Sequence, residues 1–394
     1  MRKYRKWIVV SVVVISLFSV GFILGRGAAQ EGLESKLDVF LQVLSLVKSQ
    51  YVDKNVDDNK LVYGAIKGLL ASLEDPYTRF MEPTSYKEMR IRLRGSYSGI
   101  GIYIGMKDGT LTVISPIPGT PAAKMGLKAK DKIITIDAKS TKDMSLEEAV
   151  SLIRGPKGSK VKLGIIRGSA KEPKDYLIER QNIVIKSTEF KMLTPDVAYI
   201  KFNTFEKQNA PYEVSKAIQE AKNKKAKGLI FDLRNNGGGL LDNSIQIGSM
   251  FIKSGAIVQT IDREGMREVK YSSGNVIWWQ PMVVLINEAS ASASEILAGA
   301  LQDHKIATLV GTRSFGKASV QTVRVLQDNS AVLLTIAKYL TPNGHDITKK
   351  GIVPDVVVEI PTKEAEAKAE LPEEDKEEKD IQLDRALEII KGQI

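Results

Sequence analysis

The stretch Pro281-Met-Val-Val-Leu-Ile-Asn-Glu-Ala-Ser-Ala-Ser-Ala-Ser-Glu-Ile-Leu297 decides the fold. Its apolar start predicts a buried strand, and the residues after its serines predict a helix. A serine at such a junction exposes its hydroxyl at a helix N-terminus, where unpaired backbone N–H groups can stabilise an oxyanion. The pattern fits a nucleophile at Ser290, Ser292 or Ser294, although taken alone it fits ordinary helix capping better.

The chain around this stretch alternates between strands and helices. That order implies a largely parallel sheet covered by helices, with the active site at the carboxyl ends of the strands. Gly237–Gly239 and Ser292 both follow such ends. The expected strands are 197–205, 228–233, 256–262, 268–271 and 282–287 with a closing hairpin at 320–326 and 331–339, and the expected helices are 210–226 and 241–252.

Gly316-Lys317-Ala-Ser-Val-Gln321 supplies a lysine that can act as a base. Lowering the pKa of a lysine from about 10.4 by about three units costs roughly 4 kcal/mol, and burial away from acidic groups supplies such a shift. No acidic residue lies between Asp303 and Asp328, which fits this role. Gln321 follows four residues later, where it can orient the amine without charging it.

The glycines after Asp232-Leu-Arg-Asn-Asn offer the second half of an oxyanion hole, because glycine lets backbone N–H groups turn toward a substrate carbonyl. A phosphate-binding loop is the rival interpretation, but the Lys-Ser/Thr ending of that motif is missing. The pattern therefore favours a carbonyl substrate over a nucleotide.

The chain has few of the residues and motifs that other catalytic mechanisms require. The chain has no cysteine, which excludes thiol catalysis, disulfides and thiolate metal sites. His304 and His345 lie in polar segments and are expected to be exposed, which disfavours a serine–histidine triad. The Ser-x-x-Lys pattern occurs without Ser-Asp-Asn or Lys-Thr-Gly, and no His-Glu-x-x-His is present. We expect neither a metal nor a cofactor.

The N-terminus carries a targeting signal. Four basic residues among the first six precede an uncharged run from Trp7 to Leu24. A bilayer span needs roughly 17–25 residues, whereas a signal-peptide core has about 7–15, so we favour an uncleaved membrane anchor over cleavage near Ala28-Ala29-Gln30. The basic flank should stay in the cytoplasm, which predicts a single-pass protein with its catalytic part outside.

The net charge of +10 at pH 7 does not indicate nucleic-acid binding. Lysines are spread along the chain, part of the excess lies in the N-terminal segment, and no arginine-rich or aromatic-interleaved motif occurs. The amphipathic pattern of 33–73 predicts two helices, whose apolar stripes suit a core, the commoner case, or a partner surface. Together with an amphipathic helix at 382–390, they suggest a homo-oligomer, with a dimer favoured.

A small β-rich module is expected at 95–168. Within Ser98-Gly-Ile-Gly-Ile102, the backbone N–H groups of Ile100, Gly101 and Ile102 can bind the carboxylate of a peptide C-terminus, while the peptide adds a strand beside them. The alternative is a plain β-turn. That alternative weakens because Pro116-Ile-Pro-Gly-Thr-Pro-Ala-Ala-Lys-Met-Gly-Leu127 and Asp131-Lys-Ile-Ile follow at a suitable distance.

Taken together, these motifs resemble the carboxy-terminal processing peptidases, the tail-specific serine–lysine proteases. The resemblance runs from about Asp75 to Pro354, and the order of the motifs makes it specific. They are Asp75-Pro-Tyr-Thr, the PDZ-type module, Asp232-Leu-Arg-Asn-Asn-Gly-Gly-Gly, Ser-Ala-Ser-Ala-Ser-Glu, Gly316-Lys317, and Thr341-Pro-Asn-Gly followed by Gly351-Ile-Val-Pro-Asp.

The resemblance implies roles for individual residues. Ser292 would be the nucleophile and Lys317 the base, 317 − 292 = 25 residues later, with Gln321 as the third member. The oxyanion donors would be the N–H of Ala293 and of Gly237 or Gly238. Two positions depart from the PDZ pattern, because Lys130 and Ala138 stand where glycine is common. A β-carbon disfavours the positive φ of such turns.

The implied fold is α/β, with a Clp protease/crotonase-like core, an inserted PDZ-type β-rich domain, and flanking N- and C-terminal helices. The implied organisation is an anchor or signal segment at 1–25, an N-terminal helical region at 26–94, the PDZ-type domain at 95–168, a serine–lysine protease core at 169–360, and a charged linker with an amphipathic helix at 361–394.

The predicted function is that of a serine endopeptidase acting on proteins or peptides with free C-termini. Arg154, just after a helix of the inserted module, is a candidate for gating, since a charged contact there can hold one state. One alternative is a non-catalytic PDZ-type scaffold. Another is acyl or thioester chemistry, because crotonase-like cores host several reactions.

Overall fold

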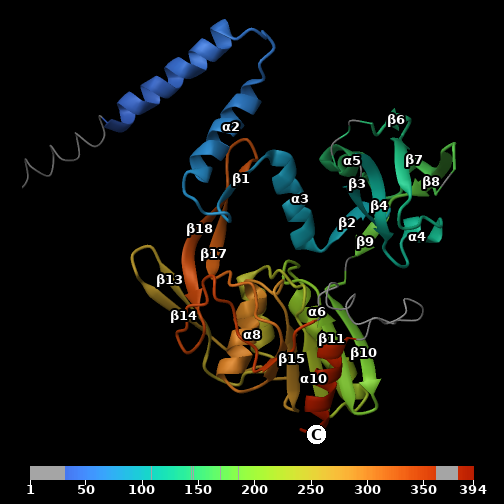
Figure 1. Cartoon of the computed structure of the whole chain (residues 1–394), viewed down its shortest axis with the longest axis vertical. Helices are drawn as coiled ribbons and strands as arrows, with labels where there is room; N and C mark the ends of the chain where they lie inside the picture. Colours follow the sequence, from blue (N-terminus) through green and yellow to red (C-terminus); the bar gives the residue numbers. More distant parts are fainter. Residues whose placement is uncertain are drawn as a thin grey trace, which may run out of the picture. The chain divides into compact units, whose positions relative to one another are not determined.

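The computed structural model describes residues 32–360 and 380–394, except for five single positions (Figure 1). The chain divides into two compact units, of which the first ends at Leu73 and the second is Glu74–Ile394. The anchor predicted at 1–25 and most of the linker predicted at 361–394 lie outside the described residues. Within the described ranges, no helix has the length and apolarity needed to span a bilayer. The five positions are Asp108, Asp143, Ser145, Ser169 and Ile185.

The first unit contains the two helices expected from sequence. Residues 32–50 are helical, and α2 spans Asp58–Ala71. Asp57 begins α2, because its carboxylate accepts the N–H groups of Asn59 and Lys60. Most of the apolar stripe of 32–50 is exposed, with Phe40 at 44%, whereas Leu44 and Val47 are partly buried. The commoner expectation, core packing, is therefore wrong for this stripe in the isolated chain.

The second unit contains a β-rich module. Its sheet has the order β3-β4-β5-β7-β8, with β6 beside β5, and β2 pairs with β9. The module extends past residue 168, because β8 pairs along β7 and its Tyr176 and Ile178 belong to the same core. The elements from β1 to β9 are β1 (Arg79–Met81), α3 (Pro83–Arg94), β2 (Ser96–Gly99), β3 (Ile102–Lys107), β4 (Thr110–Pro116), α4 (Pro121–Lys124), β5 (Lys132–Ile136), β6 (Lys139–Ser140), α5 (Leu146–Ile153), β7 (Lys160–Ile166), β8 (Lys174–Glu179) and β9 (Gln181–Val184).

Two turns of this module have a positive φ at the positions where glycine is common in the PDZ pattern. Lys130 and Ala138 have φ values of 69° and 66°, a region that a β-carbon disfavours. Asp131 is fully buried after the first turn, and both of its oxygens accept hydrogen bonds from Arg167, at 2.7 and 2.8 Å. The departure in sequence therefore leaves the turn geometry intact.

The α/β core is built on a mostly parallel sheet with the order β10-β11-β12-β15-β16-β19. All neighbours are parallel except β10, which runs antiparallel to β11. Its elements are β10 (Thr188–Thr194), β11 (Val197–Phe202), α6 (Ala210–Asn223), β12 (Gly228–Asp232), α7 (Leu241–Gly248), β15 (Met282–Ile286), α8 (Ala293–Asp303), β16 (Thr308–Gly311), β19 (Val356–Val357) and α10 (Ile381–Lys391).

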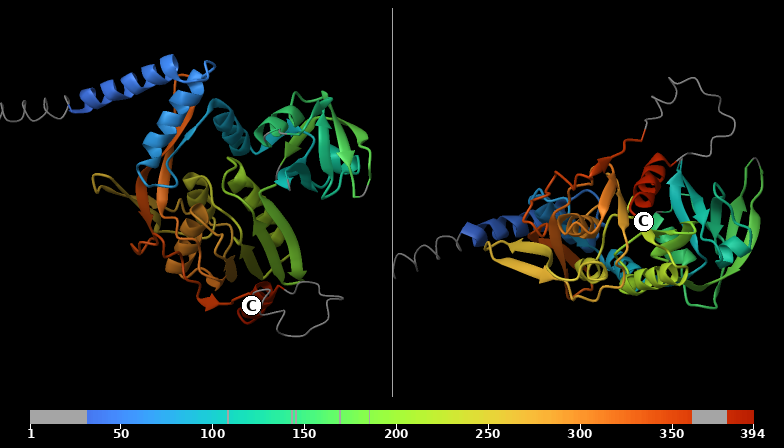
Figure 2. Two further views of the ribbon diagram at one scale, coloured as in Figure 1. Left: turned by 45° about the horizontal axis from the view of Figure 1, so that its top comes forward. Right: turned by 90° about the horizontal axis from the view of Figure 1, so that it is seen from below.

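Both faces of this sheet are buried, as near-continuous apolar strands require. Val284 and Ile286 of β15 belong to the cluster that includes residues of α6, α7 and α8. Val283 and Leu285 belong to a second cluster that includes Ala386 and Ile390 of α10, which packs against β11, β12, β15 and β16 (Figure 2). Helices therefore cover the sheet on both sides.

The expectation of one largely parallel sheet is incomplete, because a second sheet is antiparallel. It has the order β1-β18-β13-β14, and β17 also pairs with β18. Short turns join β13 to β14 and β17 to β18, and a strand that returns through a short turn must run antiparallel. The elements are β13 (Ala256–Asp262), β14 (Arg267–Tyr271), β17 (Ser319–Val325) and β18 (Ala331–Leu340).

Candidate active site

Ser292 lies between the end of β15 and the first residue of α8. Its φ of 57° and ψ of −115° place it outside the common backbone regions. Its N–H donates to the Glu295 carboxylate at 2.8 Å, and its carbonyl accepts the Tyr339 hydroxyl at 3.1 Å. These two contacts hold the turn in a conformation that costs about 1–3 kcal/mol.

The three serines of the predicted nucleophile turn differ in what their hydroxyls do. Ser290 donates to the carbonyl of Leu233 at 2.8 Å, and Ser294 donates to that of Asn236 at 2.8 Å. Both side chains are buried. Ser292 is half-buried and takes part in the capping box of α8, but within the part of the chain that the structure describes its hydroxyl donates to no acceptor. Of the three, only Ser292 has an accessible hydroxyl that is not donated to a backbone carbonyl.

The glycine loop lies directly against this turn. A β-carbon on Gly238 would lie 2.6 Å from the carbonyl oxygen of Ala291 and 2.8 Å from the backbone nitrogen of Ala293, so only glycine fits. The Gly238 N–H donates to Asn236 Oδ1 at 3.0 Å. Among the described residues, the N–H groups of Gly237 and Ala293 have no acceptor. The two free donors beside Ser292 are therefore Gly237 and Ala293.

Glu295 joins the serine turn to the segment that carries Lys317. Besides the Ser292 N–H, its two oxygens accept the N–H groups of Gly316 and Lys317, at 2.6 and 2.9 Å, and the Ser314 hydroxyl, at 2.6 Å. The residue is 1% exposed. No role for Glu295 was predicted from the sequence. The available signal was its position three residues after Ser292, the spacing of a capping box.

The Lys317 amine is not joined to Ser292. Lys317 Nζ lies 4.5 Å from the centre of the Tyr77 ring, and no hydrogen bond or ion pair of this amine occurs within the described ranges. Burial lowers the pKa of Lys317, as does the charge of Arg79, whereas Asp75 and Glu295 act in the opposite direction. The lysine is thus in the environment expected of a base but not in contact with the predicted nucleophile.

Gln321 is also apart from Lys317. Its side-chain amide donates to Ser319 Oγ at 2.8 Å and to Thr335 Oγ1 at 3.3 Å. The structure therefore brings the backbones of Ser292 and Lys317 together through Glu295 but does not join the side chains of the predicted Ser-Lys-Gln set. Neither histidine contacts this set: His304 is half-buried, with Nε2 2.7 Å from the Ala256 carbonyl, and His345 is exposed.

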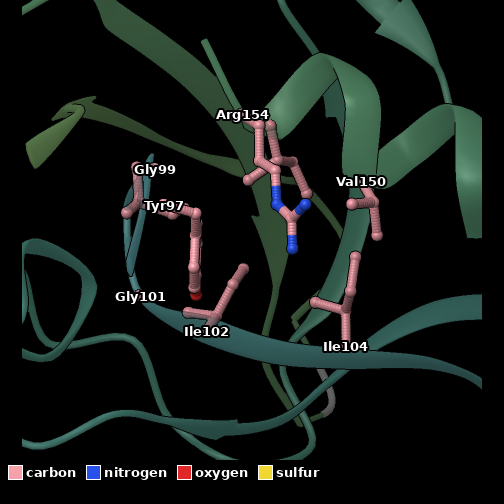
Figure 3. A pocket seen from close by; sticks show the side chains of 9 residues that line it. Tyr97, Gly99, Gly101, Ile102, Ile104, Val150 and Arg154 are labelled. Atoms are coloured by element: carbon pink, nitrogen blue, oxygen red, sulfur yellow. The ribbon is translucent and has the colours of Figure 1, made fainter. Parts of the chain in front are cut away.

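The predicted carboxylate-binding residues line a pocket in the β-rich module (Figure 3). Ile100, Gly101 and Ile102 are among its lining residues, and Figure 3 shows Val150 and Arg154 of the α5 region across from Gly101 and Ile102. Glycine is required at 101, because φ is 79° and a β-carbon would lie 2.4 Å from Thr120 Cβ. The pocket combines an apolar lining with one cationic side chain, which suits a peptide end.

Arg154 connects this pocket to a neighbouring helix. Its guanidinium carbon lies 4.5 Å from the centre of the Tyr97 ring, which also lines the pocket. The guanidinium forms an ion pair with Glu88 of α3, and both side chains are partly buried. The residue predicted for gating therefore bridges the pocket and an element outside it.

Known protein families match three parts of the chain. Residues 196–358 match the model of peptidase family S41, residues 88–166 match the PDZ domain, and residues 23–85 match the N-terminal domain of the activating protease CtpB. The carboxy-terminal processing protease CtpA of Bacillus subtilis (strain 168) is 39% identical over 355 residues, which are 90% of this chain and 75% of that protein. The chain belongs to peptidase family S41.

Other relatives of this S41 peptidase are also C-terminal processing proteases. The carboxy-terminal-processing protease of Bartonella bacilliformis (strain ATCC 35685 / KC583 / Herrer 020/F12,63) is 40% identical over 341 residues, covering 85% of this chain and 78% of that protein. The solved structure of a photosystem II D1 C-terminal processing protease is 34% identical, with a TM-score of 0.50, and the match covers 81% of this chain and 92% of that one. The predicted family, the α/β core with a PDZ domain, and a serine-type peptidase are therefore confirmed, against the non-catalytic scaffold.

Proposed function

We propose that this S41 peptidase is an endopeptidase that binds protein C-terminal tails in its PDZ domain and cleaves them with Ser292, Lys317 and Gln321. One observation carries the assignment of the nucleophile. Ser292 alone among the three serines of its turn has an accessible hydroxyl that is not donated to a backbone carbonyl, at a strained helix start fixed by Glu295. Strain held in place by surrounding contacts is typical of functional sites.

The chemistry follows from the groups around Ser292. Its Oγ attacks the carbonyl carbon of the scissile peptide bond, and the neutral Lys317 amine accepts the hydroxyl proton. The N–H groups of Gly237 and Ala293 stabilise the oxyanion, since that of Gly238 is already bound to Asn236. Lys317 then gives the proton to the leaving amine, and water hydrolyses the acyl-enzyme by the same exchange.

The proposal requires a rearrangement before the first step. Lys317 lies over the Tyr77 ring, and Gln321 is bound to Ser319 and Thr335. Substrate binding would bring the amine to Ser292, and Gln321 would turn to orient it. We propose that Arg154 contributes to this control, because a tail carboxylate in the PDZ pocket would compete with Glu88 for its guanidinium.

Active-site substitutions test the proposed nucleophile and base. Ser292→Ala and Lys317→Ala should each abolish cleavage of a tailed peptide while the melting temperature stays close to that of the parent. Labelling with a serine-directed phosphonate should be lost in Ser292→Ala. It should persist in Ser290→Ala and Ser294→Ala, whose hydroxyls bind backbone carbonyls. Full activity in either alanine variant of Ser292 or Lys317 would refute the assignment.

We also propose that the first unit pairs with a second copy of the chain. The support is the apolar stripe of 32–50, where Leu37, Phe40 and Leu41 are 44–56% exposed. Phe40→Ser with Leu37→Ser should convert a dimer to a monomer in sedimentation velocity, and an unchanged mass would contradict the idea.

For location, we propose that residues 1–25 anchor the protein in the cell membrane, with the peptidase outside the cytoplasm, because the uncharged run follows basic residues. Protease added to intact cells should digest the catalytic part, whereas protection from that protease would contradict this topology.

A further inference from the structure

The motif Asp75-Pro-Tyr-Thr forms a tight turn just before β1. Asp75 Oδ1 accepts the Tyr77 N–H at 3.0 Å, and Asp75 Oδ2 accepts the Thr78 hydroxyl at 2.7 Å. Thr78 Oγ1 in turn accepts the N–H of Thr335 in β18 at 3.0 Å. Pairing of β1 with β18 continues this attachment, with Arg79 opposite Leu333. The turn is therefore rigidly fixed to the sheet that carries Gln321.

This turn places the Tyr77 ring against the proposed base. Lys317 Nζ lies 4.5 Å from the ring centre, and in the described part of the chain the amine forms no hydrogen bond or ion pair. The face of an aromatic ring attracts an ammonium ion through its quadrupole, and it offers much less to a neutral amine. The contact therefore favours the protonated form of Lys317, which cannot accept a proton from serine.

We propose that Tyr77 is a positioning residue whose ring face holds the Lys317 amine as a cation, apart from Ser292, until substrate draws the amine to the serine. The inference rests on the proposed roles of Ser292 and Lys317. It gives the Asp75-Pro-Tyr-Thr motif a function in the peptidase, that of a resting site for the base. The same turn also restrains Gln321, since Thr335 binds both Thr78 and the Gln321 amide.

The groups around Lys317 decide the sign of the expected effect. Burial lowers the pKa of Lys317, and Arg79 of β1 lowers it further. Asp75 from the turn before β1 and Glu295 of α8 raise it, while the hydroxyl of Tyr339 in β18 binds the Lys317 carbonyl and not the amine. The ring acts in the same direction as the two carboxylates. Removing the ring face should therefore lower the pKa of Lys317 and shift activity to lower pH.

The test compares Tyr77→Phe, which keeps the ring face, with Tyr77→Leu, which removes it but leaves apolar cover. The readout is the rate at which a serine-directed fluorophosphonate labels the full chain without peptide, measured from pH 6 to pH 10. A cation–π contact in a partly desolvated site predicts a downward shift of the midpoint by about 0.5–1 pH unit for Tyr77→Leu, which is a gain of roughly 3–10-fold below the midpoint. Tyr77→Phe should leave the midpoint in place.

A second lysine–tyrosine contact supplies a matched control. Lys216 Nζ lies 5.7 Å from the centre of the Tyr212 ring on α6, where Tyr212 is exposed. Tyr212→Leu should not move the midpoint. An unchanged or raised midpoint in Tyr77→Leu would overturn the proposal, as would an equal shift in Tyr77→Phe.

If Tyr77→Leu does not fold, phenylalanine carrying one to three fluorine atoms at position 77 keeps the shape and weakens the attraction of the ring face stepwise. The midpoint must then fall with each fluorine, and a flat series would overturn the proposal. The same assay distinguishes a failure of the proposed function from a failure of this inference. Labelling that survives Lys317→Ala contradicts the role of the base, whereas a missing Tyr77 effect with an inactive Lys317→Ala removes only this inference.

Discussion

At the scale of single residues, Glu295 connects the two halves of the site. A buried carboxylate is stabilised when every lone pair finds a donor, and Glu295 accepts from three backbone N–H groups and from the hydroxyl of Ser314. The strained backbone of Ser292 and the backbone of Lys317 are both bound to it. The distance between nucleophile and base therefore depends on a residue that takes no part in proton transfer.

Glu295→Gln keeps the size of the side chain but replaces one acceptor oxygen with a donor. The new side-chain N–H group would then face backbone N–H groups that now donate to Glu295. The Ser292 turn and the Lys317 segment should therefore separate. We expect kcat/KM to fall by about 100-fold or more, because small misplacements of catalytic groups have effects of that order. The free energy of unfolding should fall by about 1–3 kcal/mol for the unsatisfied groups. Peptide kinetics and chemical denaturation measure the two effects.

Glu288→Gln is the matched control for that substitution. Glu288 lies in the loop between β15 and α8, where it is exposed and accepts the Thr312 hydroxyl at 3.0 Å. The Glu288→Gln substitution should change the free energy of unfolding by less than about 0.5 kcal/mol. Activity of Glu295→Gln within a factor of about two of the parent would contradict the positioning role.

At the scale of secondary-structure elements, apolar runs such as Met282–Ile286 predicted the buried parallel strands. A strand that is covered on both faces does not alternate between polar and apolar residues. The β17–β18 hairpin was predictable from its turn, where Asn329 has a φ of 65°. The separate antiparallel sheet was not predictable, since the pairing of β1 with β18 joins residues about 250 positions apart. Local sequence contains no signal for such a contact.

The β5–β6 turn offers a test of backbone strain at this scale. Ala138 is exposed with a φ of 66°, which costs roughly 1–2 kcal/mol for a residue with a β-carbon. Ala138→Gly removes that cost but adds about 0.5–1 kcal/mol of unfolded-state freedom. The free energy of unfolding measured by urea denaturation should therefore rise by about 0.5–1 kcal/mol. As a control, Ala123→Gly in helix α4 should lower it.

At the scale of the whole molecule, the sequence predicts that Ser292 and the glycine loop share a site because parallel strands end at the same edge, and the family resemblance adds Lys317. It could not show that the Lys317 amine lies on Tyr77, or that Gln321 binds Ser319 and Thr335. Both facts depend on side-chain conformation and on contacts between distant segments. The motif Asp75-Pro-Tyr-Thr entered the family resemblance, but its contact with the base became visible only in three dimensions.

The ion pair between Arg154 and Glu88 gives a prediction about control of the whole enzyme. Glu88→Gln removes the competitor for Arg154 and leaves the PDZ pocket unchanged. If the ion pair holds the resting state, cleavage of a peptide with an amidated C-terminus should rise several-fold, and the preference for a free carboxylate should fall. Lys87→Gln, exposed on the same helix, is the control. An unchanged ratio of the two cleavage rates would argue against gating by this contact.

Ser292 directly precedes the first residue of α8, and Lys317 lies in the loop that follows β16, the strand after this helix. One residue inserted in α8 would rotate everything after it by about 100° and move it by about 1.5 Å along the axis. We therefore expect changes of length between these two residues to impair activity more than substitutions at exposed positions of the same interval. Protein engineers who want new tail preferences should therefore graft a different β-rich module before β10 and keep this segment at its native number of residues.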